Sequence, residues 1–360
     1  MFSSLVIVGC TSRQETKVLP WEEANPIRPL PASPLGIDEK LSDLPTPPTP
    51  QTVRLGRWIF FDKRLSADGS ISCEGCHHPG SGFADTVFPS IGIRGQALTV
   101  AQPEGRPPVP RKAPALINEA WPMQPNFFWD GRMNSLDTLD IQPIANPLAE
   151  GSSFPAMIET LKNNGYGPYF REAFGVEEIT KERVGKAIAD YQRTRISGDS
   201  PWDKWKAGHD ENAVSEEVKK GDELFFGKAG CVQCHFGDGF SDSRFHNIGI
   251  GWDSKSHTFK DQGRFGVTKK ETDRGAFKTQ GLRDISLHPP YMHDGSLSTL
   301  RDVVEHYNKG GNRSPHQDVR IHPLHLTDAE VDALVKFMEA LKGEGYDDKG
   351  PSAFPQARNK

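Results

Sequence analysis

Two Cys-x-x-Cys-His motifs constrain this 360-residue chain more than any other feature of its sequence. The first motif (CEGCH) spans residues 73–77, and the second (CVQCH) spans residues 231–235. Their thiols and imidazoles belong to Cys73, Cys76, His77, Cys231, Cys234 and His235. This spacing is the attachment signature of a c-type haem, because two thiols add across the two haem vinyl groups while the adjacent imidazole reaches the iron. The motifs therefore predict two covalently bound c-type haems, with His77 and His235 as iron ligands.

Two other uses of the cysteine pairs have to be weighed against haem attachment. Four thiolates can bind one zinc ion, and a Cys-x-x-Cys pair can be a redox disulfide. Neither use explains why a histidine follows directly after both pairs. With 12 His among 360 residues, one such adjacency arises by chance about once in thirty cases. Haem attachment is the interpretation that accounts for the whole motif.

The sequence around the first motif recurs around the second. Residues 60–63 (FFDK) and 82–85 (GFAD) flank the first motif, and residues 225–228 (FFGK) and 239–242 (GFSD) flank the second. One structural unit used twice explains this pattern. We expect a mostly α fold, in which two cytochrome-c-like helical haem domains are joined by long connecting loops.

Helical periodicity favours the same fold. Residues 215–226 have helical spacing and lead into the second motif. Thr327 and Glu330 form a capping box, and apolar residues follow at helical spacing up to Leu341. The expected divisions are 1–50 for a signal, lipobox and proline-rich tether, 51–210 for the N-terminal haem domain, 211–345 for the C-terminal haem domain, and 346–360 for a loose tail.

The N-terminal residues suggest export and attachment to a membrane. Residues 7–10 (IVGC) resemble a bacterial lipobox, in which Cys10 would be acylated and become the mature N-terminus. Residues 20–50 are rich in proline and are typical of an extended tether. Together with the haem motifs, these features predict a periplasmic protein that is held at the membrane surface by a lipid. The alternative is an incidental cysteine in a frayed terminus.

Charge and hydropathy exclude some classes of partner. The formal net charge of -5 at pH 7 argues against nucleic-acid binding and leaves room for docking a basic protein. No apolar run approaches the ~20 residues that a membrane-spanning helix needs.

With these motifs, the sequence resembles the bacterial di-haem cytochrome c peroxidases and their MauG-like relatives. Besides the haem motifs, the resemblance rests on residues 55–62 (LGRWIFFD), 128–132 (FWDGR) and 290–296 (PYMHDGS), and it covers roughly residues 50–343. It implies that peroxide reacts at the haem of the N-terminal domain. The haem of the C-terminal domain would take in or relay electrons.

The resemblance also implies an open iron face at the N-terminal haem. Classical peroxidases have a distal His after a Ser-Ile-Gly triplet, whereas here residues 90–92 (SIG) are followed by Ile93, which cannot ligate iron. His78 adjoins the proximal ligand and is expected to point elsewhere. An open face is what peroxide or oxygen chemistry requires.

A tyrosine is expected on the distal side of the C-terminal haem. At the position where classical members place an axial Met, counted from Tyr291, this chain has Tyr307. MauG-like proteins resemble this chain in having an axial Tyr there. Tyr307 also shares a helical face with apolar residues, so a core position is the alternative. Met292 and His306 are rival ligands.

Two more residues are expected to take part in the chemistry. Trp129 matches the family's tryptophan between the two haems, where an indole can relay an electron hole; as relay or as core, it should be buried. The family's distal Gln and Glu fall here on Leu139 and Ala149, and Glu150 lies one residue further on. In the pocket, Glu150 could take a proton from bound peroxide and return it to the leaving oxygen. The alternative is a solvated loop carboxylate.

Calcium is a doubtful cofactor for this chain. The family binds a structural calcium between the haems, partly through the Asn of an Arg-Asn-Ala-Pro stretch, whereas residues 111–114 read RKAP. The head of Lys112 is a cation with hydrogen-bond donors only, so it cannot ligate calcium. Its ammonium could occupy the place of the ion.

The sequence therefore predicts a periplasmic, MauG-like di-haem oxidoreductase that reduces hydrogen peroxide. Its electrons would come from a small redox protein, such as a cytochrome c or a cupredoxin, or from an oxidisable residue of a protein substrate. The alternative is a non-catalytic di-haem electron-transfer cytochrome or redox sensor.

Overall fold

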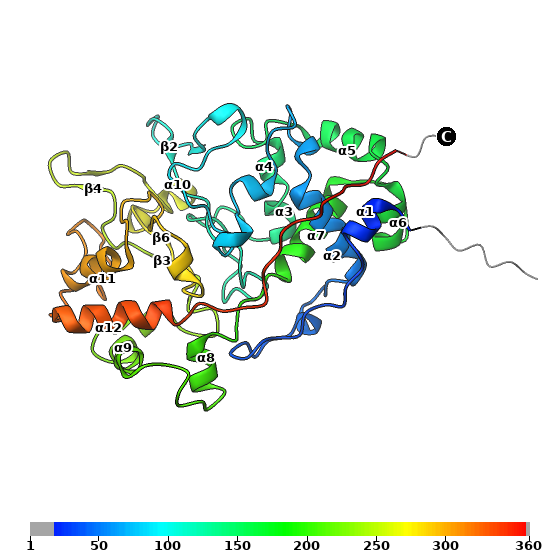
Figure 1. Ribbon diagram of the computed structural model, residues 1–360. Helices are drawn as coiled ribbons and strands as arrows, with labels where there is room; N and C mark the ends of the chain where they lie inside the picture. Colours follow the sequence, from blue (N-terminus) through cyan, green and yellow to red (C-terminus); the bar gives the residue numbers. More distant parts are fainter. Residues whose placement is uncertain (1–17, 358–360) are drawn as a thin grey trace, which may run out of the picture.

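The computed structural model describes residues 18–357, so the predictions for residues 1–17, including Cys10, lie outside the described residues (Figure 1). Its α-helices are α1 (Pro20–Ala24), α2 (Pro50–Phe61), α3 (Leu136–Leu139), α4 (Gln142–Ala145), α5 (Phe154–Asn163), α6 (Gly167–Phe174), α7 (Lys181–Arg193), α8 (Pro201–Lys206), α9 (Glu216–Phe226), α10 (Phe265–Thr268), α11 (Leu300–Asn308) and α12 (Asp328–Glu339). The fold is thus mostly helical, as expected.

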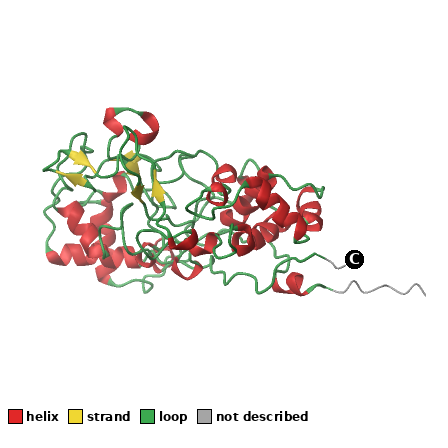
Figure 2. Ribbon diagram, turned by 90° about the horizontal axis from the view of Figure 1, so that it is seen from above, coloured by secondary structure: helices red, strands yellow, loops and turns green. Residues whose placement is uncertain are grey.

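Strands are short and form three separate two-stranded antiparallel sheets. The pairs are β1 (Thr99–Val100) with β2 (Val109–Pro110), β3 (Phe245–His246) with β6 (Phe277–Lys278), and β4 (Trp252–Asp253) with β5 (Thr258–Phe259). Figure 2 shows helices gathered at both ends of an elongated molecule, with loops filling the space between them.

Local signals explain where the main helices begin. Ser215 caps α9 by accepting a hydrogen bond from the Val218 N–H. Thr327 and Glu330 form the predicted capping box at the start of α12. The helices predicted over residues 215–226 and after residue 327 are confirmed.

Each half of the chain has its own hydrophobic cluster, and each cluster contains a close pair of helices. The N-terminal cluster is built on α2 and α7, where a Cβ added to Gly56 would lie 1.8 Å from the Ala187 carbonyl oxygen. The C-terminal cluster is built on α9 and α12, where a Cβ added to Gly221 would lie 2.1 Å from the Ala333 carbonyl oxygen. Trp202 of α8 precedes the predicted boundary at residue 210 and packs against the C-terminal cluster.

The expectation of an extended tether is wrong for the part of residues 1–50 that the structure describes. Ile37 and Leu41 are buried, and they pack with Ala120 and Ile196. Proline restricts the backbone of this segment, but the apolar side chains between the prolines still find a hydrophobic surface to cover.

The expectation of a loose C-terminal tail is also wrong for residues 346–357, the part of it that the structure describes. In Figure 1 the red segment after α12 runs along the molecule from the C-terminal helices to the N-terminal ones. The Tyr346 hydroxyl donates a hydrogen bond to Asp284 Oδ1 at 3.0 Å. Asp348 accepts hydrogen bonds from Arg57 Nε at 2.7 Å and Arg57 Nη2 at 2.6 Å. A buried aromatic ring and an ion pair thus hold this segment in place.

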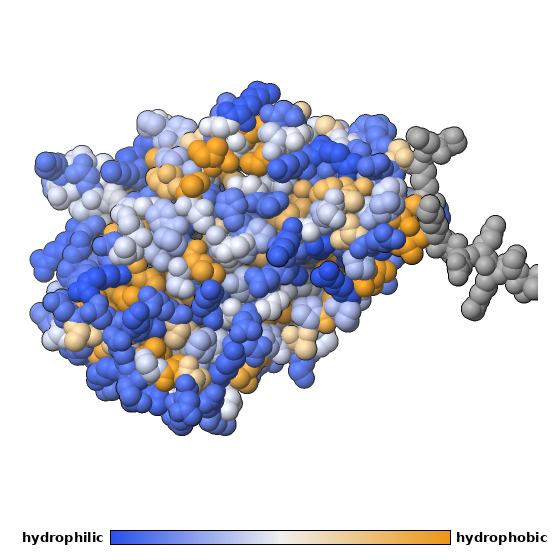
Figure 3. Space-filling view, viewed as in Figure 1, coloured by the Kyte–Doolittle hydropathy of each residue, from blue (hydrophilic) through white to orange (hydrophobic). Residues whose placement is uncertain are grey.

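Hydrophobic residues are distributed over the surface, and the described helices are short. On the face seen in Figure 3, hydrophobic side chains form scattered groups separated by hydrophilic ones. None of the helices in residues 18–357 is long and apolar enough to cross a membrane.

Candidate haem sites

Each Cys-x-x-Cys-His motif lies in the wall of its own large cavity. The cavity that we call the N cavity is lined by Cys73, Cys76 and His77, and it holds about 2000 Å³ of empty space, including space open to solvent. The cavity that we call the C cavity is lined by Cys231, Cys234 and His235, and it holds about 1960 Å³. The lining of each cavity fits one haem, because it brings together two thiols and one imidazole.

Both motif histidines are presented in the same way. His77 Nδ1 lies 3.2 Å from the Phe83 carbonyl oxygen, and His235 Nδ1 lies 2.9 Å from the Phe240 carbonyl oxygen. A carbonyl only accepts, so Nδ1 carries the proton and the Nε2 lone pair is free for iron. Burial lowers the pKa of His77 to about 4 and also lowers that of His235, which keeps both rings neutral. A neutral imidazole is the form that binds a metal.

The arrangement of the cysteines does not fit the zinc alternative. Cys73 and Cys76 line only the N cavity, whereas Cys231 and Cys234 line only the C cavity. All four are free thiols. Within residues 18–357, the one group of three or more side chains close enough to hold a metal ion contains a single motif cysteine, Cys234. The thiols therefore remain available for haem attachment at two separate places.

The N cavity also receives the carboxyl group of Glu150. This side chain is only 4% exposed, and Glu150 Oε1 lies 3.6 Å from Cys73 Sγ. Its backbone is held on both sides, because its carbonyl accepts from the Ala67 N–H at 2.9 Å and its N–H donates to the Pro143 carbonyl at 3.1 Å. Burial raises the pKa of Glu150 to about 7. The solvated-loop alternative for Glu150 does not fit this placement.

Ile93 lies outside the lining of the N cavity. It is buried, and its N–H donates to the Ala149 carbonyl oxygen at 2.7 Å. His78 is also outside the lining, with Nε2 4.0 Å from an Asp85 oxygen. Among the described residues that line this cavity, His77 is the one histidine.

The sequence analysis missed a second buried acid in the N cavity. Asp140 lines this cavity next to Leu139, and burial raises its pKa well above the usual range. Asp140 precedes Glu150 by ten residues, which is also the spacing of the family's Gln and Glu. A shift of one residue applied to both positions would have found Asp140 together with Glu150.

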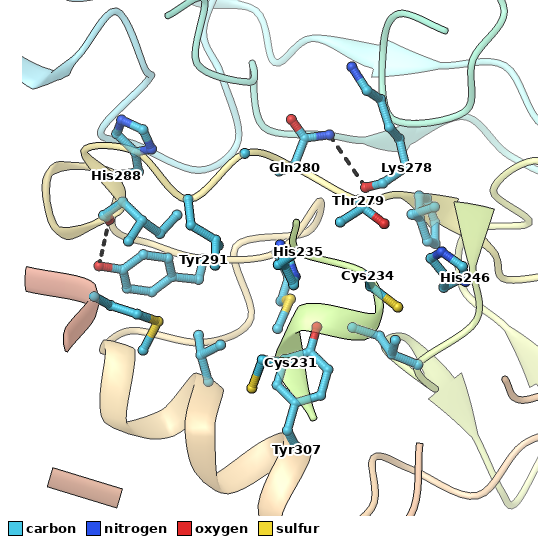
Figure 4. A pocket seen from close by; sticks show the side chains of 18 of the residues that line it. Cys231, Cys234, His235, His246, Lys278, Thr279, Gln280, His288, Tyr291 and Tyr307 are labelled. Atoms are coloured by element: carbon cyan, nitrogen blue, oxygen red, sulfur yellow. Dashed lines mark hydrogen bonds between the residues drawn. The ribbon is translucent and has the colours of Figure 1, made fainter. Parts of the chain in front are cut away.

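Tyr307 projects from α11 into the C cavity. Figure 4 shows its phenol directed toward the space beside Cys231 and His235. Burial raises the pKa of Tyr307. Of the two rival ligands, Met292 also lines the cavity, whereas His306 does not and lies with Nε2 3.0 Å from the Ile248 carbonyl oxygen.

Four further histidines that the sequence analysis did not propose as ligands line the C cavity: His246, His288, His293 and His322. The ring of His293 stacks on that of Phe277 with 3.6 Å between centroids. His293 belongs to the segment over residues 290–296 that supports the family resemblance. No local motif marks the other three histidines, because they reach the cavity through contacts between distant segments.

One wall separates the two cavities and faces both of them. The residues that line both are Lys112, Ala113, Pro114, Ala115, Glu119, Trp129, Lys278 and Gln280. Trp129 donates from Nε1 to the Lys112 carbonyl oxygen at 2.7 Å. It is half-buried rather than buried as expected, because its ring borders the cavities. The relay position predicted for Trp129 is compatible with this placement between the two motifs.

The residues at this wall do not fit a calcium ion. Lys112 Nζ donates to the carbonyl oxygens of His288 and Pro290, the latter at 2.7 Å. A calcium ion needs six to eight oxygen ligands. Here the ammonium already occupies two of the available oxygens.

Comparison with known proteins places this geometry in a family. Residues 50–211 match the family model described as di-haem cytochrome c peroxidase. The methylamine utilization protein MauG of Methylorubrum extorquens is 41% identical over 300 residues, which are 83% of this chain and 80% of that protein. The cytochrome c551 peroxidase of Nitrosomonas europaea is 35% identical over 314 residues, covering 86% of this chain and 85% of that protein.

A solved structure is similar over nearly the whole chain. It is that of a MauG-like protein associated with microbial copper homeostasis, with a TM-score of 0.75 and 28% identity. The match covers 90% of this chain and 96% of the other.

Proposed function

The chain belongs to the family of di-haem cytochrome c peroxidases and MauG, and on this premise we propose that it reduces hydrogen peroxide at the N cavity and passes oxidising equivalents to the C cavity. Members of this family carry two c-type haems, and this chain is accordingly a di-haem oxidoreductase of the peroxidase type. The observation that supports the peroxide step most directly is the buried Glu150 carboxyl beside Cys73.

The N cavity is suited to peroxide reduction because its residues can hold a haem and supply a proton-transfer group. When bound, the haems supply an iron to which peroxide can bind and the redox chemistry that cleaves its O–O bond. Among the described residues of the lining, His77 is the one histidine, so a haem held by His77 would have no second histidine to exclude peroxide. Reduction of one peroxide to two waters consumes two electrons and two protons.

Glu150 is proposed as the general base and general acid of the peroxide reaction. Its carboxylate takes the proton from the near oxygen of peroxide, and its carboxylic acid then returns that proton to the leaving oxygen. A carboxyl group whose pKa is about 7 suits both halves of this exchange, because the two forms are similarly populated near neutral pH.

Trp129 and Tyr307 are the residues proposed to carry oxidising equivalents from the N cavity to the C cavity. Among the described residues, Trp129 is the one aromatic residue that lines both cavities, so its indole could relay an electron hole between them. Tyr307 lines the C cavity and would help to hold the second iron there, where a phenolate would favour ferric and higher oxidation states. A haem held by His235 and Tyr307 would supply the C cavity with the capacity to store oxidising equivalents until a donor arrives.

The electron donor is proposed to be a small redox protein, a cytochrome c or a cupredoxin, or an oxidisable residue of a protein substrate. We further propose a periplasmic location, because the two attachment motifs favour an exported protein. Lipid attachment through Cys10 belongs to the same proposal and concerns residues outside the described part of the chain.

Rapid mixing of the holoprotein with hydrogen peroxide tests the proposed function. We expect a fast change in the absorption of the haem on His77 and consumption of peroxide. Glu150→Gln should slow this reaction by roughly 10²–10⁴-fold, the usual contribution of a general acid–base group. Glu159→Gln removes an exposed carboxyl and should have no effect. If both haems of the wild-type protein stay unchanged by peroxide, the non-catalytic electron carrier is the correct function.

A further inference from the structure

Lys112 makes four polar contacts that join the two cavities. Its N–H donates to the His293 carbonyl oxygen at 2.9 Å, and its carbonyl oxygen accepts from Trp129 Nε1 at 2.7 Å. Its ammonium donates to the carbonyl oxygens of His288 and Pro290. One residue thus holds the indole between the cavities and the loop over residues 288–293 that lines the C cavity.

The surroundings of the ammonium are those of a cation site. Lys112 is only 5% exposed. Burial lowers its pKa to about 8, although the charge of Asp85 acts in the opposite direction. Asp85 is itself buried, and its Oδ2 has no hydrogen-bond partner among the described residues. Backbone carbonyls together with a carboxylate are the oxygen donors that hard cations take in proteins.

We propose that the Lys112 ammonium is the resident cation of this junction and that the protein needs no metal ion there. The side chain brings a positive charge to the carbonyl oxygens of His288 and Pro290, where a divalent ion would otherwise find ligands. A lysine offers only donors, so it cannot ligate an ion, and its positive charge repels a divalent cation from the oxygens that it binds. The covalent tether also makes the cation permanent, whereas a bound ion can dissociate.

This inference predicts that removal of the ammonium destabilises the junction. The buried carbonyl oxygen of His288 and the partly buried one of Pro290 would lose their donor, and Asp85 would lose the nearby positive charge. Buried polar groups without partners are costly. We therefore expect Lys112→Met to lower the melting temperature of the holoprotein by roughly 5 °C or more.

Metal content and thermal stability of the holoprotein test the proposal, and neither readout depends on peroxide turnover. The wild-type protein should contain no stoichiometric calcium, and its melting temperature should be the same in EDTA and in calcium chloride. Lys112→Asn places an amide oxygen at the same carbonyls, so its melting temperature should fall in EDTA and recover with calcium chloride. Lys112→Met should be less stable in both conditions.

Lys278→Met is the matched control. Lys278 is also buried in the wall between the cavities, but its ammonium faces Glu119 at 3.6 Å and not a pair of carbonyls. Its replacement should create no calcium response. One calcium per wild-type chain, or a wild-type protein that loses stability in EDTA, would overturn the proposal even if the variants fail to accumulate. The proposal would also be overturned if Lys112→Met had the melting temperature of the wild-type protein. The same holds if the melting temperature of Lys112→Asn did not respond to calcium chloride.

Discussion

Burial sets the proton affinity of Glu150, and with it the pH range in which the proposed chemistry can run. The carboxyl lies in the wall of the N cavity, shielded from bulk water, and its pKa rises to about 7. Desolvation disfavours the charged carboxylate, which explains the direction of the shift. A glutamate in a solvated loop would be fully ionised at neutral pH and a poor proton donor to the leaving oxygen.

The pH dependence of the peroxide reaction follows from this shift. The form that accepts the proton of peroxide is the carboxylate, which is lost as pH falls below about 7. The rate of the first step should therefore rise with pH through about 7 and then level off. Stopped-flow mixing at a series of pH values measures this rate. The rise should vanish in Glu150→Gln and persist in Asp140→Asn, which removes the other buried acid of the cavity. Loss of the rise in Asp140→Asn alone would assign the proton step to Asp140.

Tyr307 permits a test at the second haem. Because Tyr307 lines the C cavity and not the N cavity, Tyr307→Phe should change the electron paramagnetic resonance spectrum of one haem and leave the other as it is. Tyr291→Phe is a close control, because its hydroxyl lines the same cavity but donates to the Ile285 carbonyl at 3.1 Å. Unchanged spectra in Tyr307→Phe, with a change in Met292→Leu, would make Met292 the ligand.

At the scale of elements, the same helix crossing occurs in both halves. Gly56 of α2 lies against the backbone of α7, and Gly221 of α9 lies against the backbone of α12. In each case two phenylalanines follow four and five residues after the glycine. Phe60, Phe61 and Phe225 enter the local hydrophobic cluster, whereas Phe226 is 43% exposed. The repeat seen in the sequence therefore corresponds to a repeated packing unit and not only to two copies of a haem motif.

Adding a side chain at either glycine should lower the free energy of unfolding. Gly56→Ala and Gly221→Ala place a Cβ at 1.8 Å and 2.1 Å from a backbone oxygen, so each helix pair has to move apart. We expect each variant to lower the free energy of unfolding by about 1–3 kcal/mol, measured by chemical denaturation of the holoprotein. Gly80→Ala is the control, because a Cβ there meets nothing within 4 Å. Equal stability of all three variants would contradict the crossing as a constraint.

At the scale of the whole molecule, the C-terminal segment fastens one half to the other. It leaves α12 in the C-terminal cluster and reaches Arg57 of α2 through Asp348. Asp348 Oδ2 also accepts from the Tyr191 hydroxyl at 3.0 Å. The side chains of Arg57 and Asp348 are 11% and 7% exposed, so solvent screens this pair weakly.

Loss of Asp348 should therefore loosen the contact between the halves. Asp348→Ala leaves the Arg57 guanidinium buried without its carboxylate, and breaking a buried ion pair costs about 3–5 kcal/mol. We expect the melting temperature of the holoprotein to fall in differential scanning calorimetry. The exposed neighbour Asp347 provides the control, since Asp347→Ala should melt like the wild-type protein. A wild-type melting curve for Asp348→Ala would show that the segment does not contribute to stability.

The sequence by itself determined the features whose information is local. A Cys-x-x-Cys-His motif identifies its two thiols and its imidazole within five residues, and helix starts such as Thr327 depend on a cap and the next few positions. The mostly helical fold and both haem attachment sites could therefore be predicted. The packing of residues 20–50 and of the C-terminal segment could not, because a proline-rich or terminal segment has no local signal for the surface that it covers.

Only the tertiary structure decided how the two sites are joined. The wall between the cavities brings together residues 112–115, Trp129, Lys278 and the loop over 288–293, which are far apart along the chain. Their adjacency depends on the packing of two helix clusters, so no spacing within the sequence encodes it. The same packing buries Glu150 and directs the Lys112 ammonium onto carbonyl oxygens, because burial and partner geometry are properties of the assembled molecule and not of a motif.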